Sequence, residues 1–156
     1  MTTKNQGFVL PALAQVGIVV KDLRKTTEYY GRLFGVGPFR NIVSAPKKHW
    51  VRGEPFPVKL NMAFAPIGSV ELELIEPIDD GPHKWFLDSR GEGLHHLGFI
   101  VDNYDDWVNY LKLQGIEILM NIERDMPGNK RRRAAYMQSD GIGGVLIELM
   151  ERQEGL

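Results

Sequence analysis

The sequence predicts an α+β fold in which two βαβββ modules, in one domain, form a shared curved sheet around a cavity. The expected order of elements is strand, helix, strand, strand, strand, and the same order then repeats. The sequence repeats as well, because QVGIVVKDL at 15–23 matches HLGFIVDNY at 96–104 and LELIE at 72–76 matches IELME at 147–151. A strand that is apolar on one face must bury that face under a helix. The opposite faces are then free to line a partly polar cavity.

The first module shows alternating and helical hydrophobic patterns in the expected order. A strand at 13–20 is followed by Asp22, a residue suited to cap a helix, and by helical spacing of apolar residues that ends at Gly35. The remaining elements of this module are a strand with irregular loop at 39–50, a turn-rich loop at 52–57, and strands at 58–65 and 70–76.

A short helix at 79–90, with Pro82 in its first turn, is expected to link the modules. The second module then starts with a strand at 95–101 and a helix that Asn103 caps. The remaining elements are a strand at 116–122, a loop at 125–130, a strand at 131–138, a turn at 139–144, a strand at 145–150 and a tail at 151–156.

The bulk composition is that of an ordinary globular protein. The 156 residues suffice for one domain with a hydrophobic core, and we place that domain at 12–152 after a flexible lead-in at 1–11, with modules at 12–78 and 93–152. The net charge of −1 favours neither nucleic acid nor an anionic membrane as a partner. The absence of cysteine excludes disulfides, and no secretion signal or membrane helix is recognisable. We therefore expect a cytoplasmic protein with a small-molecule substrate.

Four polar residues occupy equivalent positions in the repeat. Gln15 and His96 lie early in the first strand of each module, and Glu73 and Glu148 lie in the last strand of each. All four fall on the face opposite the apolar row, so a pseudo-twofold axis would bring them together. Two carboxylates, an imidazole and an amide oxygen suit Mn²⁺, Co²⁺, Ni²⁺, Mg²⁺, Fe²⁺ or Zn²⁺. The alternative is that the two glutamates are solvated residues on exposed strand faces.

The His95-His96 pair lies where a glycine-rich loop becomes a strand. Because neighbouring strand residues point to opposite faces, only one of the two should face the cavity. His96 shares its face with Gly98, which leaves room beside it, whereas His95 shares its face with apolar residues. His96 is therefore the predicted ligand.

Substrate contacts are predicted at three further positions. Lys59 and Asn61 are polar residues on the expected cavity face of the strand at 58–65, and Arg133 belongs to a basic run suited to a phosphate or carboxylate. A solvated edge strand is the alternative for that run. We expect specificity to lie in loops at 40–57 and 123–131, and Tyr136 is compatible with either packing or a site.

Together these segments resemble the vicinal oxygen chelate superfamily, which contains glyoxalase I, methylmalonyl-CoA epimerase, extradiol dioxygenases and bleomycin-resistance proteins. The resemblance covers residues 12–152 and is greatest to the methylmalonyl-CoA epimerase and glyoxalase-like branch. Its motifs are QVGIVVKDLRKTTEYYGRLFGVGPF, ELELIEP, GEGLHHLGFIVDN and GVLIELME. The resemblance places the metal ligands at Gln15, Glu73, His96 and Glu148 and implies a homodimer. The family usually has histidine where this chain has Gln15.

The expected function is that of a metal-dependent epimerase or isomerase, similar to methylmalonyl-CoA epimerase, acting on an acyl-CoA thioester or another carbonyl compound. Glu148, or failing it Glu73, would remove the proton next to the carbonyl, and Lys59 or a metal-bound water would return it. Two alternatives are a glyoxalase I-type lactoylglutathione lyase and a metal-free small-molecule-binding protein of the same fold. Gln15 is the residue that keeps the metal-free alternative open.

Overall fold

The computed structural model describes residues 7–138 and 140–153, and it confirms the α+β fold. The first module contains β1 (Gln15–Val19), α1 (Leu23–Phe34), β2 (Arg40–Ser44), β3 (Lys48–Val51), β4 (Glu54–Pro55), β5 (Leu60–Ile67) and β6 (Val70–Pro77). The linker helix is α2 (Pro82–Arg90). The second module contains β7 (Gly93–Val101), α3 (Tyr104–Leu113), β8 (Ile118–Met126), β9 (Lys130–Met137) and β10 (Leu146–Glu151).

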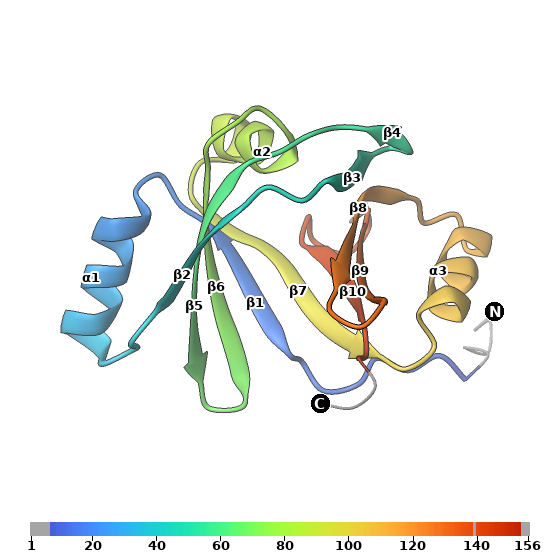
Figure 1. Ribbon diagram of the computed structural model, residues 1–156, viewed down its shortest axis with the longest axis horizontal. Helices are drawn as coiled ribbons and strands as arrows, with labels where there is room; N and C mark the ends of the chain where they lie inside the picture. Colours follow the sequence, from blue (N-terminus) through green and yellow to red (C-terminus); the bar gives the residue numbers. More distant parts are fainter. Residues whose placement is uncertain (1–6, 139, 154–156) are drawn as a thin grey trace.

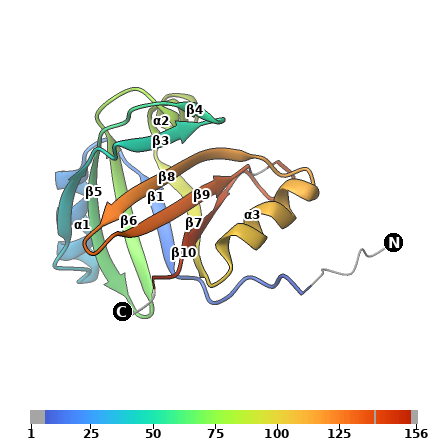
Figure 2. The same ribbon diagram turned by 45° about the vertical axis from the view of Figure 1, so that its right-hand side comes forward.

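All ten strands form one curled sheet in the order β2-β5-β6-β1-β7-β10-β9-β8-β3-β4 (Figures 1 and 2). The first strand of each module pairs in parallel with the last strand of the same module, as β1 with β6 and β7 with β10. The two first strands, β1 and β7, pair antiparallel at the centre. This arrangement is the pseudo-twofold symmetry that the sequence repeat predicts.

The segment at 40–57 is more regular than the sequence suggested. It forms β2 in the first module, and then β3, which crosses over and pairs with β8 at the edge of the second module. The segment at 123–131 is likewise the end of a regular hairpin, since β8 runs to Met126 and β9 starts at Lys130. Both predicted loops are therefore mainly strand, because cross-strand pairing satisfies their backbone groups.

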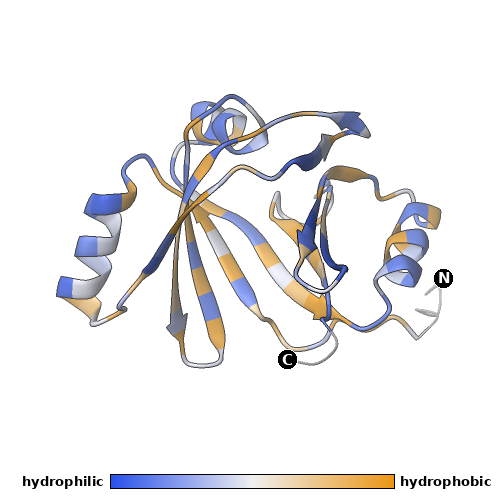
Figure 3. Ribbon diagram, in the orientation of Figure 1, coloured by the Kyte–Doolittle hydropathy of each residue, from blue (hydrophilic) through white to orange (hydrophobic). Residues whose placement is uncertain are grey.

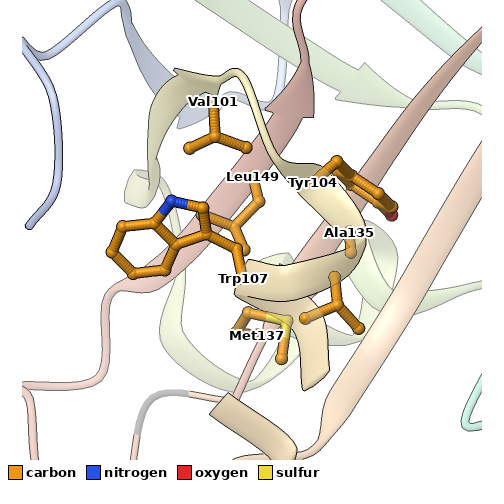
Figure 4. Packing of buried hydrophobic residues seen from close by; sticks show 7 residues of the cluster. Val101, Tyr104, Trp107, Ala135, Met137 and Leu149 are labelled. Atoms are coloured by element: carbon orange, nitrogen blue, oxygen red, sulfur yellow. The ribbon is translucent and has the colours of Figure 1, made fainter. Parts of the chain in front are cut away.

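Each module buries part of the core between the sheet and an outer helix. Helix α3 packs on the outer face of the second module, where Trp107 contacts Met137 and Leu149 (Figure 4). Helix α1 covers the first module in the same way, through a cluster that includes Leu23, Ala63 and Leu74. In Figure 3 the strands alternate between hydrophobic and hydrophilic residues, as expected for strands buried on one face.

The described part of the N-terminal segment packs on α3. Phe8, in the segment expected to be flexible, stacks on Tyr110 with ring centroids 4.3 Å apart and contacts Trp107; residues 1–6 of that segment lie outside the described residues. Of the helices in residues 7–138 and 140–153, none has the length and apolar character needed to cross a membrane.

Candidate metal centre

The centre of the sheet is built from two donors and two glycines. In the antiparallel pair of β1 and β7, Gln15 lies opposite Gly98 and Gly17 lies opposite His96. A Cβ atom on Gly17 would lie 2.0 Å from Cε1 of His96, and one on Gly98 would lie 3.0 Å from Cβ of Gln15. Each donor side chain therefore occupies the space that a side chain on the facing glycine would need.

The two glutamates extend this symmetry outward. Glu73 on β6 lies beside Gly17, and Glu148 on β10 lies beside Gly98, both through parallel pairing. All four predicted donors are thus brought to one point on the concave side of the sheet. Their exposed fractions are 7% for Gln15, 4% for Glu73, 0% for His96 and 5% for Glu148.

Three oxygen atoms converge on Nε2 of His96. This nitrogen lies 3.0 Å from Oε2 of Glu73, 3.2 Å from Oε2 of Glu148 and 3.2 Å from Oε1 of Gln15. A ring nitrogen carries at most one hydrogen, so it cannot satisfy three acceptors, and both Oε2 atoms lack any other hydrogen-bond partner within the described chain. Neighbouring ligands on an octahedron with ~2.1 Å metal–ligand bonds lie about 3.0 Å apart. The donor set therefore fits a divalent cation.

The charges at the centre support the same reading. Burial opposes protonation of His96, but the carboxylates of Glu148 and Glu73 outweigh it and raise the pKa of the imidazole to about 10. Burial also raises the pKa of Glu73, which hydrogen bonding to His96 offsets in part. A positive charge at this point stabilises the buried carboxylates, and a divalent cation can supply that charge in place of the proton on His96.

Gln15 is held in the orientation that a ligand needs. Its Nε2 donates a hydrogen bond of 2.8 Å to Oε1 of Glu71, which leaves Oε1 of the amide directed at His96. An amide that points its oxygen inward can coordinate a hard cation. Glu71, which sequence reasoning did not select, therefore positions Gln15.

The expectation that His95 and His96 face opposite ways is wrong, and a β-bulge is the reason. His96 pairs with Gly17 and Leu94 with Ile18, so His95 is an extra residue without a partner on β1. Both imidazoles therefore lie on the concave side, fully buried, with their Nδ1 atoms 3.0 Å apart. Burial lowers the pKa of His95, so its ring is neutral and can accept a hydrogen from Nδ1 of His96. That bond would leave Nε2 of His96 free for a metal.

Three of the four predicted donors, Gln15, Glu73 and Glu148, line a cavity of about 430 Å³. Tyr136 on β9, which the sequence left between packing and site, lines it directly opposite Glu148 in the strand pairing. Burial, followed by the charges of Glu148 and Glu73, raises the pKa of Tyr136, so its phenol stays protonated. On β9, Tyr136 shares its face with Ala134 and Arg132, and this alternation could have identified the face of the strand that lines the cavity.

The structure does not bring Lys59 and Asn61 to the cavity. On β5 the cavity side is the row of Met62 and Phe64, and Ala63 of the other row packs under α1. The alternation of this strand was correct, but the assignment of its faces was wrong, because the apolar row lines the cavity here and small alanines allow the helix to approach.

Arg133 is among the residues that line the cavity, but its guanidinium is paired with carboxylates outside it. Its guanidinium donates to Glu151 at 2.6 and 2.9 Å and to Asp105 at 2.7 and 3.0 Å, and it lies over the ring of Tyr104. These bonds join β9 to β10 and α3. Its neighbour Arg132, on the opposite face of β9, lines the cavity as well and has no carboxylate partner among the described residues.

Comparison with known proteins agrees with this architecture. Residues 14–136 match the model of the glyoxalase/bleomycin resistance protein/dioxygenase superfamily. The chain is 30% identical over 145 residues to mitochondrial methylmalonyl-CoA epimerase of Bos taurus, covering 90% of this chain and 74% of that protein. It is 29% identical over 140 residues to the uncharacterized protein YqjC of Bacillus subtilis, covering 89% and 91%. Among solved structures, methylmalonyl-CoA epimerase from Mycobacterium tuberculosis is similar with a TM-score of 0.63 and 26% identity, covering 94% and 91%.

Proposed function

The chain belongs to the glyoxalase/bleomycin resistance protein/dioxygenase superfamily, and from this premise we propose that it is a metal-dependent epimerase or isomerase similar to methylmalonyl-CoA epimerase. The observation that carries the proposal is the convergence of Gln15, Glu73 and Glu148 on His96, at 3.0–3.2 Å, at the wall of a cavity. The likeness to two methylmalonyl-CoA epimerases supports the choice of reaction.

The four donors would hold the divalent cation, with Glu71 and His95 orienting Gln15 and His96. When bound, the cation supplies the positive charge that stabilises negative charge developing on a substrate carbonyl oxygen. The identity of the ion, from Mn²⁺, Co²⁺, Ni²⁺, Mg²⁺, Fe²⁺ or Zn²⁺, stays a prediction, as do the homodimer and the cytoplasmic location.

Glu148 is the proposed base that removes the proton next to the carbonyl, with Glu73 as the second candidate. Both carboxylates line the cavity, where a substrate carbon can come within hydrogen-bond reach of them. The proton must return on the other face of the carbon for epimerisation. Because Lys59 lies outside the cavity, we assign that role to the protonated phenol of Tyr136.

The test is exchange of a substrate C–H proton with deuterated solvent, followed by NMR on methylmalonyl-CoA and other 2-substituted acyl thioesters. We expect metal-loaded protein to exchange this proton, and Glu148→Gln to exchange it about 10²- to 10⁴-fold more slowly. Glu28→Gln, an exposed glutamate on α1, is the matched control and should leave the rate unchanged. Absence of exchange on every acyl thioester and α-hydroxyketone would contradict the proposal.

The orientation of Gln15 bears on the metal-free alternative. A protein that only binds a small molecule has no need to direct an amide oxygen and two carboxylate oxygens at one nitrogen. The 2.8 Å hydrogen bond from Gln15 to Glu71 directs the oxygen inward and therefore favours a cation. Metal analysis after dialysis separates the two functions, because a metal-free binder would retain no stoichiometric ion.

A further inference from the structure

The β8–β9 hairpin carries different charge pairs on its two faces. Facing residues on the outer side have opposite charges, as cross-strand neighbours usually do. These pairs are Glu123 with Arg133 and Asp125 with Arg131. On the cavity side, by contrast, Arg124 lies directly opposite Arg132. Like charges placed opposite each other destabilise a strand pair, so this one pair requires an explanation.

Neither arginine of this pair is neutralised by the protein. Arg124 donates a 2.6 Å hydrogen bond to the hydroxyl of Ser44, which carries no charge. Arg132 is exposed, and in residues 7–138 and 140–153 neither guanidinium has a carboxylate within 4 Å. The neighbouring Arg133, in contrast, is paired with two carboxylates.

The glutamates of the cavity do not account for the arginine pair. Glu73 and Glu148 are already directed at His96, where a cation would balance them. A third arginine, Arg40, lines the same cavity from β2 and lies over the ring of Phe64, again without an ion pair in the described chain. The cavity therefore has its buried carboxylates at the donors, and its arginines on β2 and, as a facing pair, on the hairpin.

We infer that Arg124 and Arg132 form an oxyanion subsite, so that the substrate carries a phosphate or carboxylate group at the end opposite its reacting carbonyl. Paired guanidinium groups bind such oxyanions through parallel N–H donors, and a bound anion would turn the repulsive pair into an attractive arrangement. This inference rests on the proposed function only for the place of the carbonyl, because the anion site itself is read from the hairpin.

The strand geometry indicates that the ligand is elongated. Glu148 lies opposite Tyr136, and Arg132 is four residues further along β9. At ~3.4 Å per residue, the arginine pair lies about 14 Å along the strand from the donors. An elongated molecule with its reactive carbonyl at one end and an anionic group at the other matches this backbone offset.

Calorimetric binding to the metal-free protein tests the inference without any turnover. The probes are propionyl-CoA, which has phosphates far from its carbonyl, propionyl-N-acetylcysteamine, which has no anion, and S-propionylglutathione, which has carboxylates far from its thioester and no phosphate. We expect Arg132→Ala to weaken the binding of at least one anionic probe about tenfold and to leave the affinity for the anion-free probe unchanged. Loss of propionyl-CoA binding would identify the phosphate as the anion, and loss of S-propionylglutathione binding would identify the carboxylate.

Arg131→Ala is the matched control, because it removes the same charge from the outer face of the same strand. Ser44→Ala separates the hydrogen bond of Arg124 from its charge and should keep anion binding. The affinity of Arg132→Lys for the anionic probe should fall between those of the wild type and Arg132→Ala. Such partial rescue by a second cation would show that the loss in Arg132→Ala is not caused by misfolding. Equal affinities in all variants, or an equal loss in Arg131→Ala, would overturn the inference. If the protein exchanged deuterium but its binding did not depend on the arginines, the proposed function would stand and the subsite would be wrong. If binding depended on the arginines but no exchange occurred, the subsite would stand and the proposed function would be wrong.

Discussion

The two modules place their donors at equivalent positions but surround them with different neighbours. In the first module an amide, Gln15, is oriented by a carboxylate, and Glu73 lies opposite Phe64. In the second module an imidazole, His96, is oriented by a second imidazole, and Glu148 lies opposite Tyr136. The repeated backbone thus accounts for where these four side chains meet, while the first-choice base, Glu148, and the proposed proton donor, Tyr136, both lie in the second module.

The largest expected effect compares the two first-strand donors. We expect His96→Ala to lower affinity for divalent ions more than 100-fold and Gln15→Ala only about tenfold, because imidazole binds transition metals more strongly than an amide. Calorimetric titration with Mn²⁺, Co²⁺, Ni²⁺ and Zn²⁺ measures both. Gln15→His should increase the affinity. Equal losses in both alanine variants would remove the difference between the modules.

The next effect concerns the two central glycines. Gly17→Ala should cost about 3 kcal/mol of unfolding free energy, since its Cβ would meet the buried imidazole of His96 at 2.0 Å. Gly98→Ala should cost less, because the nearest atom is Cε of Met150, at 2.9 Å, which belongs to a flexible side chain.

Urea denaturation measures both changes, and Gly31→Ala is the control. Gly31 lies in α1 with its nearest neighbour at 3.6 Å, so alanine there should stabilise the protein by up to ~1 kcal/mol. A greater loss in Gly98→Ala than in Gly17→Ala would contradict this account of the centre.

A smaller effect is expected from exchanging the residues opposite the two glutamates. Tyr136→Phe removes the proposed donor, so epimerisation should fall about tenfold or more while exchange of the substrate proton with deuterium persists. When Phe64→Tyr is added to Tyr136→Phe, the new phenol lies in the first module and should not restore epimerisation. Parallel measurement of optical rotation and NMR exchange distinguishes the two. If both rates fell together, Tyr136 would act on substrate placement and not on proton return.

The smallest effect is on the attachment of the outer helices. Arg133 joins α3 to the sheet through Asp105 and Glu151, whereas α1 is joined by a hydrogen bond from the backbone N–H of Leu23 to Glu76. Hydrogen bonds from Arg133 lower the pKa of both Asp105 and Glu151. Their contribution is therefore present above the ordinary carboxyl pKa and lost as the pH falls through the lowered values.

We expect Arg133→Ala to cost about 1 kcal/mol near neutral pH and progressively less in acid. Thermal melts from pH 7 to pH 3 measure this. A cost that did not change with pH would show that Arg133 acts through its packing on Tyr104.

The sequence predicted much of this arrangement because the repeat and the alternation of strands are local patterns. They identified the two modules, the central strands and the four polar residues that the fold brings together. They failed where one strand departs from regular alternation, at His95, and where both rows of a strand were candidates for the cavity, as with Lys59 and Asn61. Arg133 was chosen over Arg132 because a run of like residues carries no information about which face turns inward.

By itself, the sequence determined the fold class, the repeat and the four polar residues that meet at the centre, since these depend on residue spacing along the chain. Only the tertiary structure decided that β3 crosses to the second module, that a bulge turns His95 beside His96, and that Arg124 meets Arg132 at the cavity. The physical reason is that strand pairing between distant segments sets register and curvature. Those two properties determine which side chains share a cavity.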